Sequence, residues 1–387
     1  MAKIIIIGGG IIGSSLAWNL AKSGAGTDVI VVEPDPSYEF AATPRAVGGV
    51  RFVQGLRENL LMSLYGQKIF KNFQKIVDIE KDHVELGFHE CGYLFLGKGT
   101  SADAFQANHQ MLTAHGAEIE LLDRPKLMAF LPSFNFDDVD VALYSPRDAR
   151  IDPYAALQGY RKAAIRLGIV YKKDRVVDIN HNGSTIRSVS LDSGQQLPAE
   201  LVINAANCWA PEICSMVRMP IPIEPVRRQT FFFDMKNQEE LFPAIRDHTG
   251  LSVRPDSSGF ITGKTAVGGK TGFNWDLDHR EFDDELWPLM AHRNKSFEVI
   301  KYKGGWVGHY DQNKMDANPI LGHWKGGISN FIIAAGFSGH GLQHAPAVSL
   351  GLSELIQYGE YRTFDLSLFS YERVANDKPI EDTGPTP

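Results

Sequence analysis

The chain has 387 residues, 43% hydrophobic and 22% charged, a composition typical of a globular protein with room for two domains. Its formal net charge of −7, without a block of basic residues, argues against a nucleic-acid partner. Cys91, Cys208 and Cys214 show no metal-ligand spacing, so we expect no metal site and no structural disulfide. No apolar run reaches the roughly 20 residues that span a bilayer. The first predicted strand begins at residue 3, which leaves no room for a signal peptide, and we expect a cytoplasmic protein.

The first predicted element is a strand over residues 4–7, four isoleucines in a row, as in a strand buried on both faces of a parallel sheet. Gly8, Gly10 and Gly13 follow as G-x-G-x-x-G, and an amphipathic helix begins with Ile12 on its apolar side. In such a turn the first glycine makes the tight bend, the second lets the backbone approach a pyrophosphate, and the third lets helix and strand pack closely. The N–H groups and dipole of the helix N-terminus favour the phosphates.

An acidic residue follows at the expected distance. The next predicted strand, residues 28–32, leads into Glu33, twenty residues after Gly13. An acid at this distance binds a ribose hydroxyl of an adenosine nucleotide. Pro34 begins a sharp exit from the strand. The loop over residues 40–52 then combines threonine, proline, arginine and paired glycines, which predicts a loop close to a ligand, with two arginines available for anionic groups.

Further elements follow in an alternating pattern. Helices are predicted over residues 58–77, 153–167 and 345–358, with Asp152 as an N-cap, and another helix ends near residue 297. Strands are predicted at residues 92–96, 117–122, 169–172, 175–180, 186–191, 201–204, 226–233, 251–254, 260–262 and 331–335. Nucleotide-type β/α pieces thus occur at the start, middle and end of the chain, and strand-rich insertions fill the gaps.

This order predicts two interleaved domains. We expect a Rossmann-like α/β dinucleotide-binding domain and an α+β substrate domain built on an antiparallel sheet. The first would consist of residues 1–83, 145–219 and 321–375, the second of residues 84–144 and 220–320, and a loose C-terminal tail of residues 376–387. Two domains woven through each other place a crevice between them, which is a natural ligand site.

A second glycine-rich turn, GFSGHG at residues 336–341, follows a hydrophobic strand and opens a helix. The N–H groups of that helix N-terminus are suited to stabilise negative charge. A chain with two such turns can hold a large dinucleotide at both ends, with the pyrophosphate at the first turn and the redox-active ring at the second. For His340, a backbone or packing role is the main alternative to proton chemistry.

Six segments resemble, in the same order, the FAD-dependent oxidoreductases of the D-amino-acid-oxidase superfamily. They are GGGIIGSSLAWNLA with Glu33, TPRAVGGVRF, ARIDPYAALQGY, LVINAANCWA, GWVGHYDQNKMDANPILG and GFSGHGLQHAP. These segments extend from residue 4 to about residue 353. Within the superfamily, the chain is most similar to the sarcosine-oxidase, glycine-oxidase and proline-dehydrogenase β-subunit branch and to the FAD-dependent oxidoreductase-domain proteins.

The resemblance implies an FAD cofactor and the residues that surround it. The implied residues, from the pyrophosphate and adenosine to the flavin, are Gly8, Gly10, Ile12, Gly13, Glu33, Pro34, Val176, Ala206, Trp209, Thr43, Arg45, Ala46, Gly48, Gly49, Gly308, Gly339, His340, Gly341, Leu342 and Gln343. Reduced flavin carries negative charge at its N1/C2=O end, so the second helix N-terminus would raise its electron affinity. Covalent sarcosine oxidases use a cysteine where Gly308 stands, so we expect the FAD to be non-covalent.

Family chemistry is the transfer of a hydride from a carbon next to an amine nitrogen to flavin N5, giving an imine that hydrolyses. The implied partners are a small-molecule amine or amino acid, and oxygen or an electron acceptor. A substrate carboxylate needs a cation, ideally an arginine fork, for which Arg51 is the first candidate and Arg254 the second. Tyr310, with His309 beside it, matches a tyrosine near the substrate in related enzymes, and Gln343 completes the candidate catalytic set. An exposed strand position for Arg254 and a packing role for Tyr310 are the plainer alternatives.

Several positions depart from the sarcosine-oxidase pattern. Gln54 and Gln343 stand where those enzymes have a second arginine and a lysine that grip the carboxylate. A lysine linked there to oxygen activation aligns with Ile261, although Lys264 is close by. These changes argue against sarcosine itself and against rapid use of oxygen. They leave open a flavin-binding assembly or scaffold protein with little or no turnover. A reductase that binds two nucleotides is disfavoured, because the chain has no second complete G-x-G-x-x-G.

Overall fold

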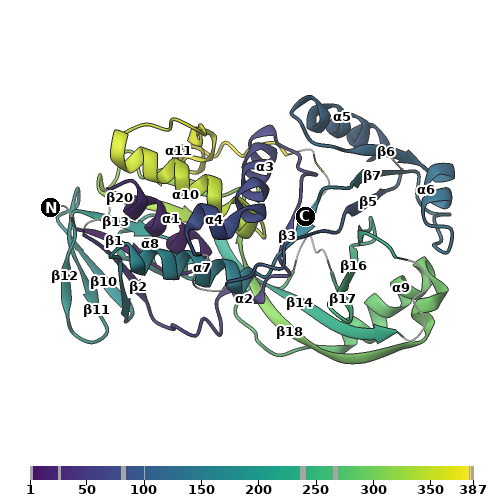
Figure 1. Cartoon of the computed structure of the whole chain (residues 1–387). Helices are drawn as coiled ribbons and strands as arrows, with labels where there is room; N and C mark the ends of the chain where they lie inside the picture. Colours follow the sequence, from purple (N-terminus) through teal and green to yellow (C-terminus); the bar gives the residue numbers. More distant parts are fainter. Residues whose placement is uncertain are drawn as a thin grey trace.

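The computed structural model describes residues 3–24, 28–79, 84–99, 101–235, 241–264, 269–382 and 384. Figure 1 shows two lobes side by side, the first containing the N-terminal strand β1 and the second containing the long strands β14 (Ile223–Met235) and β18 (Ile300–Asn313). Across the described ranges, no helix is both long and apolar enough to cross a bilayer.

The first lobe is built on a six-stranded sheet. Its order is β19 (Ile320–His323), β20 (Phe331–Ala335), β13 (Leu201–Asn204), β1 (Ile4–Ile7), β2 (Val29–Glu33) and β9 (Val170–Lys173). Every neighbouring pair is parallel apart from β19 and β20. Strands from the start, middle and end of the chain share this sheet, which confirms the expected α/β class with interleaved segments.

Both faces of the sheet are covered, as the isoleucines of β1 predict. Ile4 and Ile6 join the core beneath one helical layer, and Ile5 and Ile7 join a separate core on the opposite face. Burying one such side chain contributes about 1.5–3 kcal/mol. The first layer contains α1 (Ile11–Lys22), α3 (Arg57–Lys71), α4 (Phe73–Val77), α7 (Pro153–Arg166) and α10 (Gly341–Tyr358). The opposite face carries α8 (Ala210–Met216) and a small sheet of β10 (Val176–His181), β11 (Ile186–Leu191) and β12 (Gln196–Pro198).

The structure confirms one predicted helix cap and changes the bounds of two predicted helices. The Asp152 carboxylate accepts a hydrogen bond from the Ala155 N–H at 3.0 Å and caps α7, as predicted. The single helix predicted over residues 58–77 is wrong, because Asn72, with φ −119° and ψ 27°, divides it into α3 and α4. Helix α10 begins at Gly341 rather than at residue 345.

The second lobe is built on an eight-stranded sheet. Its order is β18, β14, β17 (Gly259–Lys264), β16 (Leu251–Asp256), β15 (Ala244–Arg246), β5 (Tyr93–Gly97), β7 (Val141–Ser145) and β6 (Glu120–Asp123). All neighbours are antiparallel except β15 and β5, which confirms the expected antiparallel sheet. Helices α5 (Ser101–Ala114), α6 (Arg124–Phe130) and α9 (Trp287–Arg293) and a π-helical turn, Glu281–Leu286, complete the lobe.

Short elements occupy the region between the lobes. They are α2 (Ala42–Arg45), β3 (Gly49–Val50), β4 (His89–Glu90) and β8 (Ala149–Arg150), and the three strands form one small sheet. We propose the predicted division into a nucleotide domain and a substrate domain, because the strands of the six-stranded sheet come from the three segments assigned to the first, apart from Ile320 at the start of β19. The boundary at residue 83 and tail residues 383 and 385–387 lie outside the described residues. In the described part of the tail, the Ile380 N–H donates to Asp316 at 3.1 Å.

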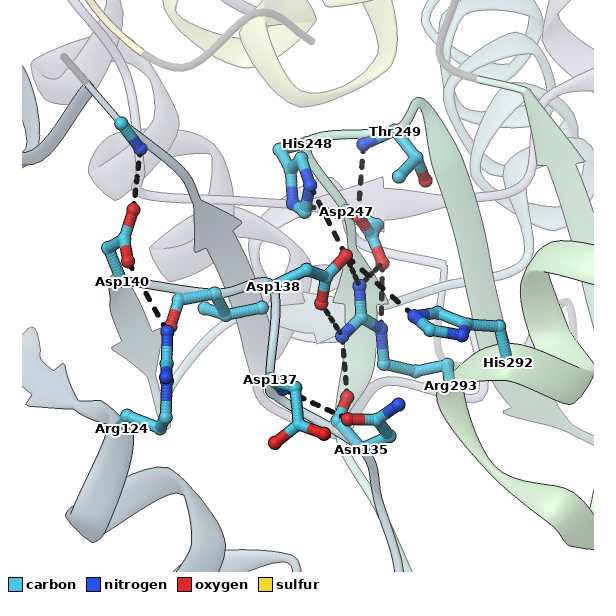
Figure 2. A network of polar contacts seen from close by, with 12 residues as sticks. Arg124, Asn135, Asp137, Asp138, Asp140, Asp247, His248, Thr249, His292 and Arg293 are labelled. Carbon is cyan, nitrogen blue, oxygen red and sulfur yellow. Dashed lines mark hydrogen bonds and ion pairs between the residues drawn. The ribbon is translucent and has the colours of Figure 1, made fainter.

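A buried ion-pair network holds one end of the second lobe together (Figure 2). The Arg293 guanidinium, 1% exposed, contacts Asp247 at 2.6 Å and Asp138 at 2.8 Å. The ring of His248 lies 3.1 Å from Asp247. Since Asp247 directly follows β15, this network fixes the position at which Arg246 leaves the strand.

Substituting Arg293→Met should destabilise the protein strongly, because it leaves Asp247 and Asp138 without their buried counter-charge. Breaking such a pair from one side costs about 3–5 kcal/mol. Chemical denaturation of the purified protein measures the loss. The matched control is Arg280→Met, which removes an ion pair with Asp278 from a side chain that is 82% exposed and should change the free energy of unfolding by less than about 1 kcal/mol. Equal effects of the two substitutions would contradict a stabilising role for the network.

Candidate functional site

A cavity lies where the carboxyl ends of β1 and β2 meet the second lobe. Its walls come from the glycine turn after β1, the loop over residues 40–51, the start of α10, and strands β14, β15 and β18. The carboxyl edge of a parallel sheet is the usual place for a ligand in a doubly wound fold. The crevice expected between two interleaved domains is therefore present.

The three positions of the first turn are glycine for different structural reasons. Gly8 has φ +99°, and a Cβ there would lie 2.6 Å from the carbonyl oxygen of Ala205. A Cβ at Gly13 would lie 2.0 Å from the carbonyl oxygen of Gly8, so the helix packs directly on the turn. At Gly10 the nearest atom, Thr43 Oγ1, would be 3.7 Å away, and Gly10 lines the cavity. Protein packing thus requires glycine at positions 8 and 13, whereas at position 10 the space lies open to a ligand.

Glu33 lies at the end of β2 beside this turn. Its carboxylate accepts hydrogen bonds from the N–H groups of Gly9 at 2.8 Å and Asp35 at 2.9 Å. Burial raises the pKa of Glu33, and these two hydrogen bonds oppose the shift. Pro34 and Val176 line the same end of the cavity. The acid is thus held in a fixed position from which it can accept further hydrogen bonds from hydroxyl groups.

The second glycine-rich turn lies at the other end of the cavity. Asp311, on β18, accepts hydrogen bonds from the N–H groups of Gly336 at 2.7 Å and Phe337 at 3.1 Å. Gly339 has φ +95°, and a Cβ there would lie 2.5 Å from the ring of Tyr310. Within the described chain, the N–H groups of Gly341 and Leu342, in the first turn of α10, have no backbone acceptor. The helix N-terminus therefore faces the cavity with free donors.

His340 and Gln343 were predicted to present their backbone N–H groups to the flavin, and neither residue lines the cavity. The His340 N–H donates instead to the carbonyl oxygen of Phe337 at 2.9 Å. His340 stacks on His344 with ring centroids 5.4 Å apart, and burial lowers its pKa well below the usual value, so the ring is neutral. The Gln343 side chain accepts a hydrogen bond from the Arg51 backbone N–H at 3.1 Å and donates one to Ser63 at 3.1 Å. Gln343 thus positions the backbone of Arg51.

The loop that carries α2 is attached to β18 at two points. The Arg45 guanidinium donates a hydrogen bond to the carbonyl oxygen of Val307 at 2.7 Å. In return, the indole N–H of Trp306 donates to the carbonyl oxygen of Arg45 at 2.9 Å. A Cβ at Gly308 would lie 3.2 Å from the Arg45 side chain. The predicted flavin loop and the long strand of the second lobe therefore form one wall of the cavity.

Arg51 and Arg246 line the cavity, and within the described residues neither forms an ion pair. Arg51 is 6% exposed, and its guanidinium has no ion-pair partner within the described residues. Arg246, which the sequence did not single out, has buried Nε and Nη1 atoms without a hydrogen-bond partner. Burial and the neighbouring charge of Arg51 lower the pKa of Arg246 to about 9. An unpaired buried charge is costly, so this part of the cavity is suited to an anion.

Asp148 is the acid whose charge acts on both arginines. Its Oδ1 accepts hydrogen bonds from the Phe52 N–H at 2.8 Å and the Ser145 hydroxyl at 2.6 Å, while Oδ2 is buried without a partner. Burial raises the pKa of Asp148 to about 7. This carboxyl group thus offsets only part of the arginine charge near neutral pH.

Arg254, the second candidate for the carboxylate, does not line the cavity. It is 6% exposed, donates a hydrogen bond to the Tyr93 hydroxyl at 3.0 Å and to the carbonyl oxygen of Val47, and forms an ion pair with Asp256 at 3.2 Å. Its guanidinium therefore has partners within the protein, and it supports Tyr93, which does line the cavity. The alternative of an exposed strand position is wrong as well, because Arg254 is buried.

His309 lies in the cavity wall as a neutral ring. Its Nε2 accepts a hydrogen bond from the Asn274 N–H at 3.1 Å, and its ring lies 4.3 Å from the Trp275 ring. Burial lowers the pKa of His309 to about 4. With Nε2 acting as an acceptor, the proton of the neutral ring is on Nδ1, which is buried without a partner. This N–H has no acceptor within the described residues.

The structure brings most of the predicted residues to one cavity. Those that line it are Gly8, Gly10, Ile12, Glu33, Pro34, Thr43, Arg45, Ala46, Gly48, Gly49, Arg51, Val176, Ala206, Trp209, Gly308, His309, Tyr310, Gly339, Gly341 and Leu342. Gly13, Arg254, His340 and Gln343 lie behind the wall. The lining residues that sequence reasoning missed include Tyr93, Arg228, Thr230 and Arg246. They come from strands with no local motif, so no sequence signal distinguishes them.

Asp148→Asn should change how stability depends on pH. An unfolded aspartate ionises near about pH 4, whereas the folded protein holds this proton to about pH 7. Between these values the folded state binds more protons, so the contribution of Asp148 to the free energy of unfolding decreases as the pH rises and is constant above pH 7. The variant lacks this decrease, so the stability of Asp148→Asn relative to the wild type should increase from pH 4 to 7. Urea denaturation at several pH values tests this, and a difference that is constant with pH would contradict it.

The chain matches the FAD dependent oxidoreductase family, DAO, over residues 3–355. It is similar to FAD-dependent oxidoreductase domain-containing protein 1 of Xenopus laevis, with 30% identity over 98% of this chain and 84% of that protein. It is also similar to mitochondrial dimethylglycine dehydrogenase of Rattus norvegicus, with 28% identity over 94% of this chain and 44% of that protein. Monomeric sarcosine oxidase of Bacillus sp. (strain B-0618) is 24% identical over 98% of both chains.

Solved structures support the same fold. L-proline dehydrogenase from P. horikoshii superimposes with a TM-score of 0.86 and 24% identity, covering 98% of this chain and 99% of that one. Glycine oxidase from Geobacillus kaustophilus gives a TM-score of 0.82 and 20% identity, covering 95% of this chain and 98% of that one. With the fold, the cavity and the match over most of the sequence in agreement, the chain belongs to the DAO family of FAD-dependent oxidoreductases.

Proposed function

We propose that the protein binds FAD non-covalently in this cavity and oxidises the C–N bond of an amine that carries a carboxylate, such as an amino acid or an N-alkyl glycine. The observation that carries the proposal is the unpaired, buried Arg51 in the cavity that also contains the two glycine-rich turns. A dinucleotide bound across those turns would lie beside a cation suited to a carboxylate. The relatives that act on N-methylated glycines and amino acids agree with this assignment.

The protein atoms around the cavity fit FAD. The open space at Gly10 and the N-terminus of α1 suit a pyrophosphate, and Glu33 suits the adenosine ribose. The free N–H groups at the start of α10 suit the electron-rich end of the flavin. We propose that the predicted residues lining the cavity hold the cofactor, whereas Gly13, His340 and Gln343 support them from behind.

The cysteines support a non-covalent cofactor. Cys91, Cys208 and Cys214 are all outside the cavity lining, and Gly308, which lines it, has no side chain to attach. Burial raises the pKa of Cys208 well above its usual value, which keeps its thiol protonated and unreactive. The Cys208 thiol instead donates to the carbonyl oxygen of His309 at 3.5 Å.

Bound FAD supplies an acceptor for a hydride, the hydrogen and both electrons of the C–H bond next to the substrate nitrogen. Loss of that hydride leaves an iminium ion, to which water adds, and the C–N bond then breaks to release a carbonyl compound and a protonated amine. Arg51 orients the substrate through its carboxylate. The positive charges of Arg51 and Arg246 also disfavour an ammonium group nearby, so they favour the uncharged amine from which a hydride can leave.

The electrons must then leave the cofactor for oxygen or for an electron-acceptor partner. Within the described residues, no lysine lines the cavity. Lys264, noted from the sequence, forms an ion pair with Glu285 instead, and Ile261 is buried. This arrangement favours a dehydrogenase that uses an acceptor other than oxygen.

A flavin-binding scaffold with little turnover is the alternative. The glutamines at the two departures from the sarcosine-oxidase pattern, Gln54 and Gln343, both hold the backbone of Arg51 and do not reach the cavity, since Gln54 donates to the carbonyl oxygen of Arg51 at 3.2 Å. Glutamines in place of two of the three cations favour this alternative. The intact glycine frame and the buried Arg51 favour the enzyme.

Anaerobic mixing of the purified protein with a panel of amines distinguishes the enzyme from the scaffold protein. The protein should be yellow, and acid precipitation should release the flavin into the supernatant. N-alkyl glycines, cyclic imino acids and simple amino acids are then mixed with it in turn, and one of them should bleach the flavin absorbance. A colourless protein would exclude the cofactor, whereas a yellow protein that no amine bleaches would favour the scaffold. The rate at which oxygen restores the colour separates an oxidase from a dehydrogenase.

Gly10→Ala should lower the affinity for FAD without unfolding the protein. A Cβ at this position has room among the protein atoms, 3.7 Å from Thr43 Oγ1, but it occupies the space proposed for the pyrophosphate. We expect FAD to bind about tenfold more weakly or worse, with unchanged thermal stability of the flavin-free protein. Gly13→Ala provides the contrast, because its Cβ would clash with the Gly8 carbonyl oxygen and destabilise the fold itself. Full flavin content in Gly10→Ala would contradict the proposed cradle.

Arg51→Met should impair reduction of the flavin while FAD remains bound. Losing one partner of a buried charge pair costs about 2–5 kcal/mol, so the second-order rate constant for anaerobic reduction should fall by roughly 30-fold or more. Arg51→Lys should recover part of the loss. The control is Arg57→Met, because the Arg57 side chain is 55% exposed and pairs with Glu58 on the surface. Unchanged kinetics in Arg51→Met would refute its role in binding substrate.

A further inference from the structure

We propose that the substrate is a dianion, an amine that carries two carboxylate groups, with one held by Arg51 and the other by Arg246. This inference rests on the proposed function, since it specifies the substrate class of the same cavity. The proposed function uses one arginine to bind a substrate carboxylate, and this inference adds a second. Arg246 is then a specificity-determining residue.

The environment of Arg246 shows that the protein does not satisfy this side chain. Arg246 lines the cavity, and its Nε and Nη1 atoms are buried without a hydrogen-bond partner. Leaving a buried donor unpaired costs about 1–3 kcal/mol, and more when the group is charged. A ligand carboxylate in the cavity would supply this guanidinium with an acceptor and a counter-charge. The unsatisfied atoms thus point to a carboxylate rather than to an apolar substituent.

The charges around the cavity favour two carboxylates over one. Arg254 lies outside the cavity lining and is paired with Asp256 within the protein. Asp148 lies close enough to influence Arg51 and Arg246 but forms no ion pair with either, and its pKa of about 7 leaves it partly protonated at neutral pH. A substrate with one carboxylate and a neutral amine leaves the Arg246 guanidinium without a counter-charge. A substrate with two carboxylates balances both.

The two arginines are supported from different lobes. The Arg51 backbone is fixed by Gln343, at the start of α10. Arg246 is the last residue of β15, and the next residue, Asp247, is held by Arg293 in the buried network of Figure 2. Their like charges repel each other, as the lowering of the Arg246 pKa by Arg51 indicates. Separate supports and mutual repulsion favour two carboxylate subsites over a single carboxylate gripped from both sides.

Matched pairs of amines test the proposal. The holoenzyme is mixed anaerobically with N-methylglycine and N-(carboxymethyl)glycine, and with alanine and aspartate in both configurations. Within the pair that is oxidised, we expect the dicarboxylate to reduce the flavin with a second-order rate constant about tenfold higher or more. In Arg246→Met the rate constant for the dicarboxylate should fall roughly 30-fold or more, while that for the monocarboxylate changes by less than about threefold. Arg246→Lys should restore part of the dicarboxylate preference, and Arg57→Met should leave both rates unchanged.

A binding measurement separates failure of this inference from failure of the proposed function. Acetate, malonate and succinate cannot be oxidised at a C–N bond, but binding beside the flavin shifts its absorbance spectrum. One possible outcome is that no amine reduces the flavin, yet malonate or succinate binds more tightly than acetate and Arg246→Met removes that difference. This outcome would support the site for two carboxylates and would contradict amine oxidation. Preference for monocarboxylates, or equal losses for both classes in Arg246→Met, would overturn the inference while leaving amine oxidation intact. If Arg246→Met does not retain FAD, the preference of the wild type and of Arg246→Lys for dicarboxylates over monocarboxylates tests the inference instead.

Discussion

The parallel pairing of β1, β13 and β20 is the constraint on which the site depends. Parallel strands end at the same edge of a sheet, so the turns after β1 and β20 deliver the N-termini of α1 and α10 to one cavity although they lie at opposite ends of the sequence. Each helix presents free N–H groups and the positive end of its dipole there. A long ligand with negative charge at two places can be held only because the sheet fixes both helices at once.

Local chemistry explains which parts of the site were predictable. Gly8 and Gly13 are required by a positive φ and by a backbone contact within the turn itself, so a short motif identifies them. Glu33 is predictable because it lies at a characteristic distance after Gly13 within one β-α-β unit. The antiparallel lobe and the interleaving of segments also followed from the sequence, because the hydrophobic periodicity and the family motifs recur in order. These features are set by residues close in sequence or by a motif.

The parts that were missed are set by contacts between distant segments. Arg246 belongs to a three-residue strand whose parallel partner, β5, comes much earlier in the chain, so no local periodicity marks it. Gln343 was also assigned to the candidate catalytic set, but its side chain turns away from the cavity to the backbone of Arg51. Arg254 was assigned to the substrate because it is a cation on a strand of the second lobe. Only the contacts with Tyr93 and Asp256 show that its guanidinium already has partners within the protein. Side-chain direction, not position in the chain, separates these cases.

The double attachment of Arg45 to β18 has a consequence for how molecules enter and leave. Its guanidinium bonds to Val307 and its carbonyl oxygen to Trp306, so the two lobes are tied together directly at the wall of the cavity. Hinge-like opening of the lobes would have to break both hydrogen bonds and expose the groups that form them. Exchange of small molecules is therefore easier through local movement of side chains at the cavity mouth than through separation of the lobes. By the same reasoning, a cofactor as large as FAD would enter most readily before the lobes dock, so its insertion would belong to folding rather than to turnover.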